Sequence, residues 1–317
     1  MGHGIAVIGL GVVGRRMIEQ AAQHAGIRVA AAWDNSAAQR AAAARDYPGL
    51  PMAEDARAAI ERLDVAAVYV AVPPLAHREY VEAAVAAGKA VFCEKPLAVS
   101  LDEGRAMLDT VAGAGVPQAV NFPFASAPGV ARLAERLDAA FGLRSIEVRV
   151  RFHRWPRDWQ ATATWLERGD QGGFTREVLS HFVYLLMRLR GTVELRRAIS
   201  ARDGDDAAEH FVAAMLDAGG IPVAMSGSVG GAAPDVIEAA FHGAGRTLRL
   251  VDFYRLLEDS DGQSTPVPDL PVDARTATYQ GQLDQLAALL DGRPHTLCDF
   301  ATALQVQTIV ERKLAPR

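Results

Sequence analysis

The chain has 317 residues, half of them hydrophobic, which allows a sizeable core and suggests two domains. Its net charge of −5 comes without any basic stripe, so we expect no nucleic-acid partner. Cys93 and Cys298 are too few for a disulfide framework, and no apolar run is long enough to predict a membrane span. The first predicted strand begins near the N-terminus without a visible signal peptide, so the sequence predicts a cytoplasmic protein.

A strand, a glycine-rich turn and a helix are predicted at the N-terminus. Residues 4–8 are a short apolar run, residues 12–25 are amphipathic, and the turn between them is Gly9-Leu10-Gly11-Val12-Val13-Gly14. Asp34 follows at the end of a second apolar run, residues 27–33. This is the dinucleotide-binding fingerprint in its expected context, with glycines for a tight turn and close backbone approach to a pyrophosphate. The alternative is a structural turn in an unrelated α/β fold.

The first 120 residues alternate between predicted strands and helices. The expected strands are 4–8, 27–33, 65–72, 90–93 and 118–121, and the expected helices are 12–25, 36–46, 55–62, 76–87 and 101–112. Short apolar strands separated by helices predict a parallel sheet that is covered on both faces. We therefore expect a doubly wound α/β domain over residues 1–120, with its ligand at the carboxyl ends of the strands.

Residues 121–317 predict a second, α+β domain with a largely antiparallel, open sheet. The expected strands are 145–153, 194–200, 210–216, 223–228, 237–242 and 247–251, and the expected helices are 127–140, 177–189, 276–290 and 300–314. Along 145–153 the apolar residues alternate with Glu147, Arg149, Arg151 and His153. Because successive side chains of a strand point to opposite faces, one face should pack on the core and the other should be solvated or pair with a second subunit.

Two further patterns carry candidate chemistry. Lys95, in Glu94-Lys95-Pro96, follows a predicted strand at the edge where the cofactor should bind. Glu177 and His181 lie four residues apart on one predicted helix, where a carboxylate beside an imidazole can relay protons. The alternatives are a surface lysine and an ordinary Glu–His pair on a helix.

Taken together, these motifs resemble the Gfo/Idh/MocA oxidoreductase family, over essentially the whole chain. The resemblance also uses the segment from Val72-Pro73-Pro74 to His77 and the Gly172-Gly173 pair before His181. It implies a Rossmann domain that binds NAD, with NADP possible, and a lysine and a histidine that flank the nicotinamide. Lys95 and His181 match those positions, and Glu177 replaces the family's usual aspartate.

The resemblance and the motifs give the following expected site. Lys95, His181 and Glu177 are the predicted catalytic residues. The predicted cofactor-binding residues are Gly9, Leu10, Gly11, Val12, Val13, Gly14, Asp34, Val72, Pro73, His77, Glu94 and Lys95. The predicted substrate-binding residues are Lys95, Asn121, Trp155, Arg176 and His181, and no metal is expected.

Three departures from the family concern the substrate more than the cofactor. Glu177 stands where the family usually has an aspartate and has a longer side chain. Val72-Pro73-Pro74 replaces Thr-Pro-Asn, and no arginine follows Asn121 at the expected place. The loop at 154–159, which holds Trp155, could clamp a sugar or carboxylate, or could pack on its own domain. Arg176 lies at the start of a helix, where a cation needs a partner: an acidic side chain such as Glu177 or Asp170, or a substrate carboxylate.

The sequence thus predicts an NAD(P)-dependent oxidoreductase that acts on a hydroxyl-bearing carbon of a sugar, cyclitol or related polyol or sugar acid. The alternatives are a non-catalytic dinucleotide-binding regulator on the same fold and an imine or enone reductase. A homodimer or homotetramer through the open sheet is expected, because relatives usually associate there and two-fold symmetry is the commonest form.

Overall fold

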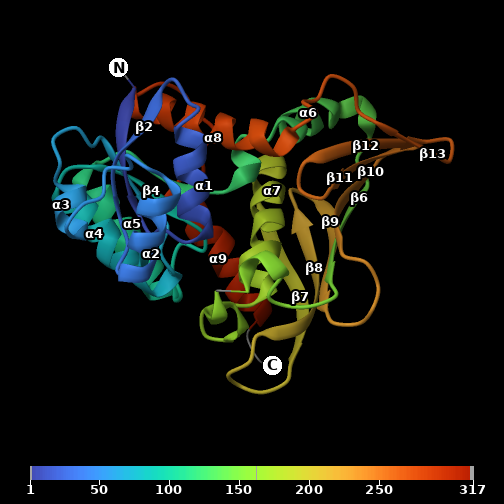
Figure 1. Cartoon of the computed structure of the whole chain (residues 1–317). Helices are drawn as coiled ribbons and strands as arrows, with labels where there is room; N and C mark the ends of the chain where they lie inside the picture. Colours follow the sequence, from blue (N-terminus) through green and yellow to red (C-terminus); the bar gives the residue numbers. More distant parts are fainter. Residues whose placement is uncertain (1, 162, 315–317) are drawn as a thin grey trace. The chain divides into compact units, whose positions relative to one another are not determined.

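A five-stranded parallel sheet forms the N-terminal part of the protein in the computed structural model, which describes residues 2–161 and 163–314 (Figure 1). The strands are β1 (His3–Ile8), β2 (Ile27–Trp33), β3 (Ala67–Val70), β4 (Ala90–Glu94) and β5 (Gln118–Asn121). Their order, β2-β1-β3-β4-β5, is that of a doubly wound sheet and confirms the predicted fold class.

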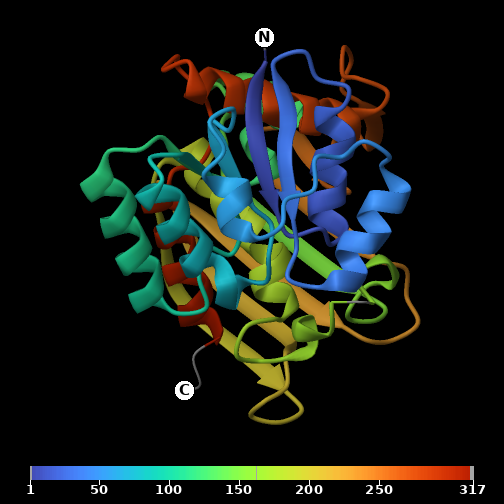
Figure 2. The ribbon, with the colours of Figure 1, turned by 60° about the vertical axis from the view of Figure 1, so that its left-hand side comes forward.

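Helices cover both faces of this sheet. They are α1 (Val12–Ala21), α2 (Ala37–Asp46), α3 (Ala56–Ile60), α4 (His77–Ala86) and α5 (Leu101–Ala114). Figures 1 and 2 show α4 and α5 side by side on one face. The strands between the helices are almost entirely apolar and buried, as expected for a parallel sheet with no solvent-exposed face.

A mixed eight-stranded sheet forms the second half and is antiparallel except where β6 pairs with β9. In chain order the strands are β6 (Ser145–Phe152), β7 (Val193–Arg202), β8 (Glu209–Ala218), β9 (Ile221–Val229), β10 (Val236–His242), β11 (Arg246–Val251), β12 (Arg255–Ser260) and β13 (Gln263–Pro266). Along β6 the alternation is as predicted, with Ile146, Val148, Val150 and Phe152 buried. The last two strands were not predicted.

The remaining helices are α6 (Pro128–Arg136), α7 (Ser180–Arg190), α8 (Ala274–Leu290) and α9 (Phe300–Leu314). Helix α7 is apolar almost all round and buried, and it packs against β7 and β8. The predicted helix at 177–189 differs at its start, because Thr175–Leu179 form a π-helix that leads into α7. Such wide turns are rare and occur often at functional sites.

The described residues divide into two compact units, and the boundaries of these units differ from the expected boundary at residue 120. The first unit contains the chain up to Phe122 and also Tyr279–Leu304, and the second contains Pro123–Thr278 and the described residues after Leu304. The sequence assigned all of 121–317 to the second domain. The difference arises because most of α8 packs on the first unit, where Gln280 donates to the Gln20 side chain (2.7 Å) and His24 bonds Asp284 (3.0 Å).

Candidate active site

The glycine turn between β1 and α1 has the geometry that a dinucleotide requires. Gly9 has φ +104°, a conformation that side chains rarely adopt. A Cβ on Gly14 would lie 1.9 Å from the Gly9 carbonyl oxygen, so only glycine fits there. By contrast, nothing lies within 4 Å of the corresponding point at Gly11. The turn is therefore closed toward the protein at Gly9 and Gly14, and open for a ligand at Gly11.

Asp34 connects the end of β2 to this turn. One carboxylate oxygen accepts a hydrogen bond from the Leu10 backbone N–H (2.7 Å), and the other accepts from the Ser36 N–H (2.8 Å). Arg40 donates to the carbonyl oxygens of Asp34 (2.7 Å) and Asn35 (3.2 Å). The carboxylate is thus held beside the glycine turn, in the position where the adenosine ribose binds in Rossmann folds.

The His77 side chain links two turns of the first unit through hydrogen bonds with their backbone carbonyl groups. Its Nδ1 lies 3.1 Å from the Leu97 carbonyl oxygen, and its Nε2 lies 3.0 Å from that of Val72. Burial lowers the pKa of the His77 imidazole, although these carbonyl groups and that of Pro96 oppose the shift. The buried ring holds the turn after β3 next to the turn after β4. We therefore revise the role of His77 from a cofactor ligand to a residue that shapes the site.

Glu94, directly before Lys95, is held by a buried polar network. Its Oε1 accepts hydrogen bonds from the Tyr69 hydroxyl and from Asn121 Nδ2 (2.7 Å). Burial, with the nearby Glu94 carboxylate, raises the pKa of the Tyr69 hydroxyl, so Tyr69 remains a donor. Gln282 Nε2, from α8, donates in turn to Asn121 Oδ1. The Lys95–Pro96 peptide that follows is cis.

This network changes the interpretation of Asn121, which was expected to bind substrate. Its amide is 5% exposed, and both its oxygen and its nitrogen bond protein side chains. Neither Gln282 nor Tyr69 was predicted to belong to the site. A polar hydroxyl within an apolar strand is a weak sign that Tyr69 has a polar partner. Nothing local in the sequence connects Gln282 to Asn121, 161 positions earlier.

In the second unit, Glu177 lies in the π-helix and is engaged by residues of the 154–160 loop. Gln160 Nε2 donates to Glu177 Oε1 (2.9 Å), and the Arg157 guanidinium lies 3.8 Å from the same oxygen. Arg157 also stacks on Phe152, Trp155 and Trp159, at 4.7 to 5.8 Å from their ring centres. The chain thus supplies Glu177 with an amide and a cation that hold its carboxylate in place.

His181 lies at the start of α7 and is 8% exposed. Its ring packs edge-to-face against Phe124 (6.1 Å between ring centres) and Phe253 (5.7 Å). Neither aromatic residue was predicted to lie at the site. Phe253 lies in a hairpin turn, where a phenylalanine carries no recognisable functional pattern.

Trp155 and Arg176 are structural in this arrangement, in contrast to the substrate contacts expected for them. The Trp155 indole N–H donates to the Leu166 carbonyl (2.9 Å), and its ring packs against Phe152 and Phe174, which supports the packing alternative. Arg176 is 7% exposed and forms two hydrogen bonds to Glu311, of 2.8 and 2.7 Å. Its NH1 also donates to the carbonyl oxygens of Gly169 and Gly172.

The partner of Arg176 is therefore Glu311 of α9, rather than Glu177, Asp170 or a substrate carboxylate. Asp170 instead pairs with Arg168 (2.7 Å). Burial alone would lower the pKa of the Arg176 guanidinium, but Glu311, together with the charges of Glu209 and Asp170, outweighs burial and the net shift is upward. Arg176 thus remains a cation that anchors the segment carrying Glu177 and His181.

Glu209 anchors the same segment from β8. Its Oε1 accepts from the Thr175 N–H (2.6 Å), and a Cβ on Gly173, which has φ +94°, would meet its Oε2 at 2.3 Å. The Gly172-Gly173 pair therefore leaves room for a buried carboxylate at the start of the π-helix. Burial raises the pKa of Glu209, although its hydrogen bonds with Thr175 oppose the shift.

Neither a metal-binding cluster nor a helix that could span a membrane occurs in the described part of the chain. No group of three or more His, Cys, Asp or Glu side chains there could hold a metal ion. None of the helices in residues 2–161 and 163–314 is long and apolar enough to cross a membrane.

Comparison with known proteins agrees with this geometry. Residues 3–122 match the model of the oxidoreductase family with an NAD-binding Rossmann fold, Gfo/Idh/MocA. An inositol 2-dehydrogenase from Paracoccus denitrificans is 41% identical over 115 residues, which are 35% of this chain and only 34% of that protein. The chain is therefore matched over about a third of that curated relative's length.

Solved structures extend the likeness in fold to the second unit. An oxidoreductase from Thermotoga maritima superposes with a TM-score of 0.84 at 14% identity, covering 99% of this chain and 96% of that one. An oxidoreductase from Agrobacterium radiobacter, in complex with NAD+, L-tartaric acid and magnesium, gives 0.82 at 20% identity, covering 98% and 95%. Residues 3–122 thus match the NAD-binding Rossmann domain of the Gfo/Idh/MocA oxidoreductase family, and the rest of the chain shares its fold with solved oxidoreductases.

Proposed function

We propose that the protein is an NAD-dependent oxidoreductase that transfers a hydride between nicotinamide and a hydroxyl-bearing carbon of a polyol, sugar or sugar acid. The observation that carries the proposal is the turn at Gly11, open toward a ligand and bordered by the Asp34 carboxylate. The names of the relatives support the substrate class, because one curated relative is an inositol 2-dehydrogenase and the Agrobacterium structure holds L-tartaric acid, a hydroxy acid.

In this proposal the bound cofactor supplies the hydride acceptor or donor, and the protein supplies orientation and proton transfer. Lys95 hydrogen-bonds the substrate oxygen and stabilises the charge that develops on it. His181 takes the hydroxyl proton during oxidation and returns it during reduction. Glu177, held by Gln160, orients the imidazole and stabilises its protonated form.

We propose NAD as the preferred cofactor. The Asp34 carboxylate would accept hydrogen bonds from the ribose hydroxyls, whereas the 2′-phosphate of NADP would meet a like charge. Titration of the protein with each cofactor tests this choice. We expect the wild type to bind NAD more tightly than NADP. The difference in affinity between the two cofactors should be smaller in Asp34→Asn. It should be unchanged in Asp46→Asn, the control, which removes a carboxylate that pairs with Arg15. Tighter binding of NADP by the wild type would overturn the choice.

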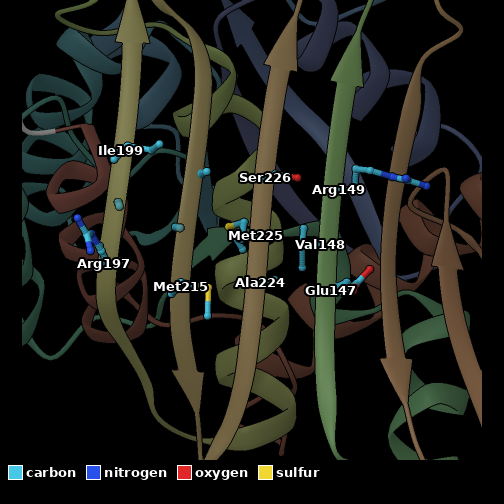
Figure 3. A pocket seen from close by; sticks show the side chains of 12 residues that line it. Glu147, Val148, Arg149, Arg197, Ile199, Met215, Ala224, Met225 and Ser226 are labelled. Carbon is cyan, nitrogen blue, oxygen red and sulfur yellow. The ribbon is translucent and has the colours of Figure 1, made fainter.

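We also propose a homodimer, or a dimer of dimers, that forms through the open face of the eight-stranded sheet. A hollow of about 500 Å³ lies on this face, and Ile199 and Met215, about half exposed, point from β7 and β8 (Figure 3). Exposed apolar side chains in a row are typical of an interface. The charges on the neighbouring strands support a second copy of the chain as the occupant.

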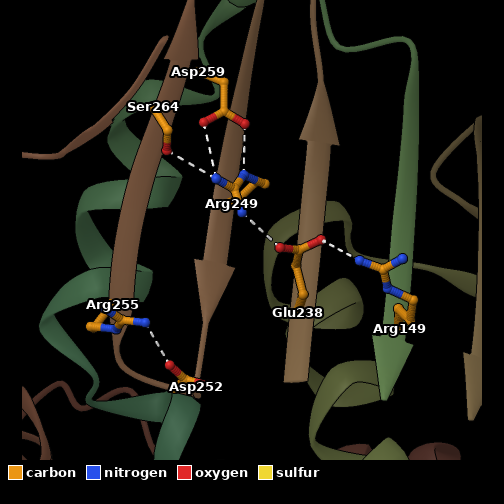
Figure 4. Close-up of polar contacts among 7 residues, drawn as sticks. All are labelled: Arg149, Glu238, Arg249, Asp252, Arg255, Asp259 and Ser264. Atoms are coloured by element: carbon orange, nitrogen blue, oxygen red, sulfur yellow. Dashed lines mark hydrogen bonds and ion pairs between the residues drawn. The ribbon is translucent and has the colours of Figure 1, made fainter. Parts of the chain in front are cut away.

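Charges of both signs continue this face across β6, β10, β11 and β12 (Figure 4). Arg249 bonds Asp259 (2.6 Å) and Glu238 (2.8 Å), and Arg149 lies 3.7 Å from Glu238. A surface with both signs can complement itself about a two-fold axis. Light scattering should show a dimer or tetramer for the wild type and a smaller species for Met215→Lys. A monomeric wild type at micromolar concentration would reject the proposal.

A further inference from the structure

The turn between β11 and β12 has an unusual backbone. Asp252 and Phe253 both have positive φ, at +50° and +67°. The Tyr254 N–H donates to the Val251 carbonyl (3.2 Å), which closes a tight turn around these two residues. Such turns normally use Asn-Gly or similar pairs, and a bulky residue with positive φ is a clear outlier.

The surrounding structure holds this turn in its strained form. Arg255 donates to the Asp252 carboxylate (2.7 Å), as Figure 4 shows, and the Asp252 N–H donates to the Ile237 carbonyl (2.9 Å). On the other side, α6 approaches so closely that a Cβ on Gly129 would lie 2.9 Å from the Tyr254 carbonyl oxygen. Strain that the neighbouring structure maintains in this way is found most often at functional sites.

The strained turn brings the Phe253 ring into contact with the candidate catalytic histidine. The Phe253 and His181 ring planes are almost perpendicular (85°), with their centres 5.7 Å apart. Phe253 also stacks on Phe182, the next residue of α7, at 5.9 Å, and lies 5.8 Å from Phe124. His181 therefore has an aromatic neighbour on two elements that are distant in sequence, Phe124 and Phe253.

We propose that Phe253 is a positioning residue for His181, and that the strained turn exists to deliver its ring. The inference rests on the proposed role of His181 as the proton-transfer group. The perpendicular ring limits rotation of the imidazole about its Cβ–Cγ bond and excludes water from one side. A phenylalanine fulfils this role because its ring is rigid and its edge and face attract another ring at this angle.

Three variants distinguish the effect of the Phe253 ring from the effect of the backbone strain. Phe253→Leu keeps a Cβ and apolar volume but removes the ring, and Phe253→Gly removes both the ring and the strain. Asp252→Gly is the matched control, because it relaxes the adjacent residue of the same turn and removes its contact with Arg255 but leaves the ring in place. Urea unfolding of each variant identifies those that are folded, and only these are compared.

The first readout is deuterium exchange at the His181 Cε1–H, followed by mass spectrometry, which requires neither cofactor nor substrate. We expect exchange to be several-fold faster in both Phe253 variants than in the wild type, and unchanged in Asp252→Gly. Unchanged exchange in folded Phe253→Leu and Phe253→Gly would overturn the proposal. So would equal acceleration in Asp252→Gly, because that would assign the effect to the turn instead of the ring.

The second readout is turnover on an identified substrate. Misplacing a reacting group by about 1 Å can cost about a hundredfold in rate, so kcat should fall on the order of tenfold to a hundredfold in both Phe253 variants. The KM for NAD should not change, since Phe253 contacts His181 and belongs to the unit that lacks the glycine turn. If exchange is faster but kcat is unchanged, the positioning of His181 by Phe253 is supported. The catalytic role proposed for His181 is then refuted.

Discussion

Arg176 and Glu311, 135 residues apart in the chain, form a two-pronged ion pair in which the arginine side chain is almost completely buried. The pair joins the start of the π-helix to α9 within the second unit. It fixes the segment that carries Glu177 and His181 without contributing a group to the chemistry.

Removing Arg176 should therefore destabilise the protein strongly. Truncating one partner of a buried pair leaves an unpaired charge and costs about 3–5 kcal/mol. We expect a loss of this size for Arg176→Ala in urea unfolding. Arg168→Ala is the matched control, because its pair with Asp170 is exposed and such pairs contribute about 0–1 kcal/mol. Equal losses in the two variants would contradict the structural role of Arg176.

Substitutions at two glycines of the turn should have different effects, one on the stability of the fold and the other on the affinity for NAD. Gly14→Ala places a Cβ 1.9 Å from a backbone oxygen, so we expect a loss of about 3 kcal/mol or more. Gly11→Ala meets no protein atom within 4 Å, so its stability should stay within about 1 kcal/mol of the wild type. Its affinity for NAD should nevertheless fall at least tenfold, as about 1.4 kcal/mol of lost contact would produce. Normal NAD titration by Gly11→Ala would show that the pyrophosphate does not approach there.

Gln282 should influence the cofactor site through Asn121 and Glu94. We expect Gln282→Leu to raise the KM for NAD severalfold, because the Asn121 amide then loses the donor that fixes its orientation. Gln280→Leu is the control on the same helix, since Gln280 bonds Gln20 and does not join the network. Steady-state kinetics with both variants makes the comparison. The account would be wrong if the two changes affected the KM for NAD equally.

Glu209 gives a prediction for the dependence of stability on pH. Its folded-state pKa is raised, so the native state retains a proton that the unfolded chain releases. The associated stability is complete below the ordinary carboxyl pKa, about 4.3, and is lost as the pH rises through the raised value. Glu209→Gln has no such group. The free energy of unfolding of the wild type relative to Glu209→Gln should therefore fall with increasing pH, and a flat or rising difference would contradict the assignment.

Much of the first unit could be predicted because its signals are local. The turn at Gly9–Gly14 and the alternation of apolar strands with helices depend on residues that are close in sequence. The fold class and the family match of residues 3–122 followed from them.

The missed features depend on contacts between distant segments. The strands β12 and β13 carry many exposed polar residues, so they lack the alternation of a half-buried strand. No local pattern indicates that α8 packs on the first unit, because an apolar helix face does not specify its partner. For the same reason the sequence assigned Arg176 to the substrate, although Glu311 satisfies its charge.

The central claim is that the protein oxidises a polyol-type substrate with NAD and uses Lys95 to do so. The most direct measurement is the appearance of reduced nicotinamide absorbance when the protein and NAD are mixed with cyclitols, sugars and sugar acids. We predict a signal with at least one of these compounds, reduced by about 10²- to 10⁴-fold in Lys95→Ala while the Kd for NAD stays within about twofold. Full activity of Lys95→Ala, or tight NAD binding without a signal from any of the compounds, would contradict the account.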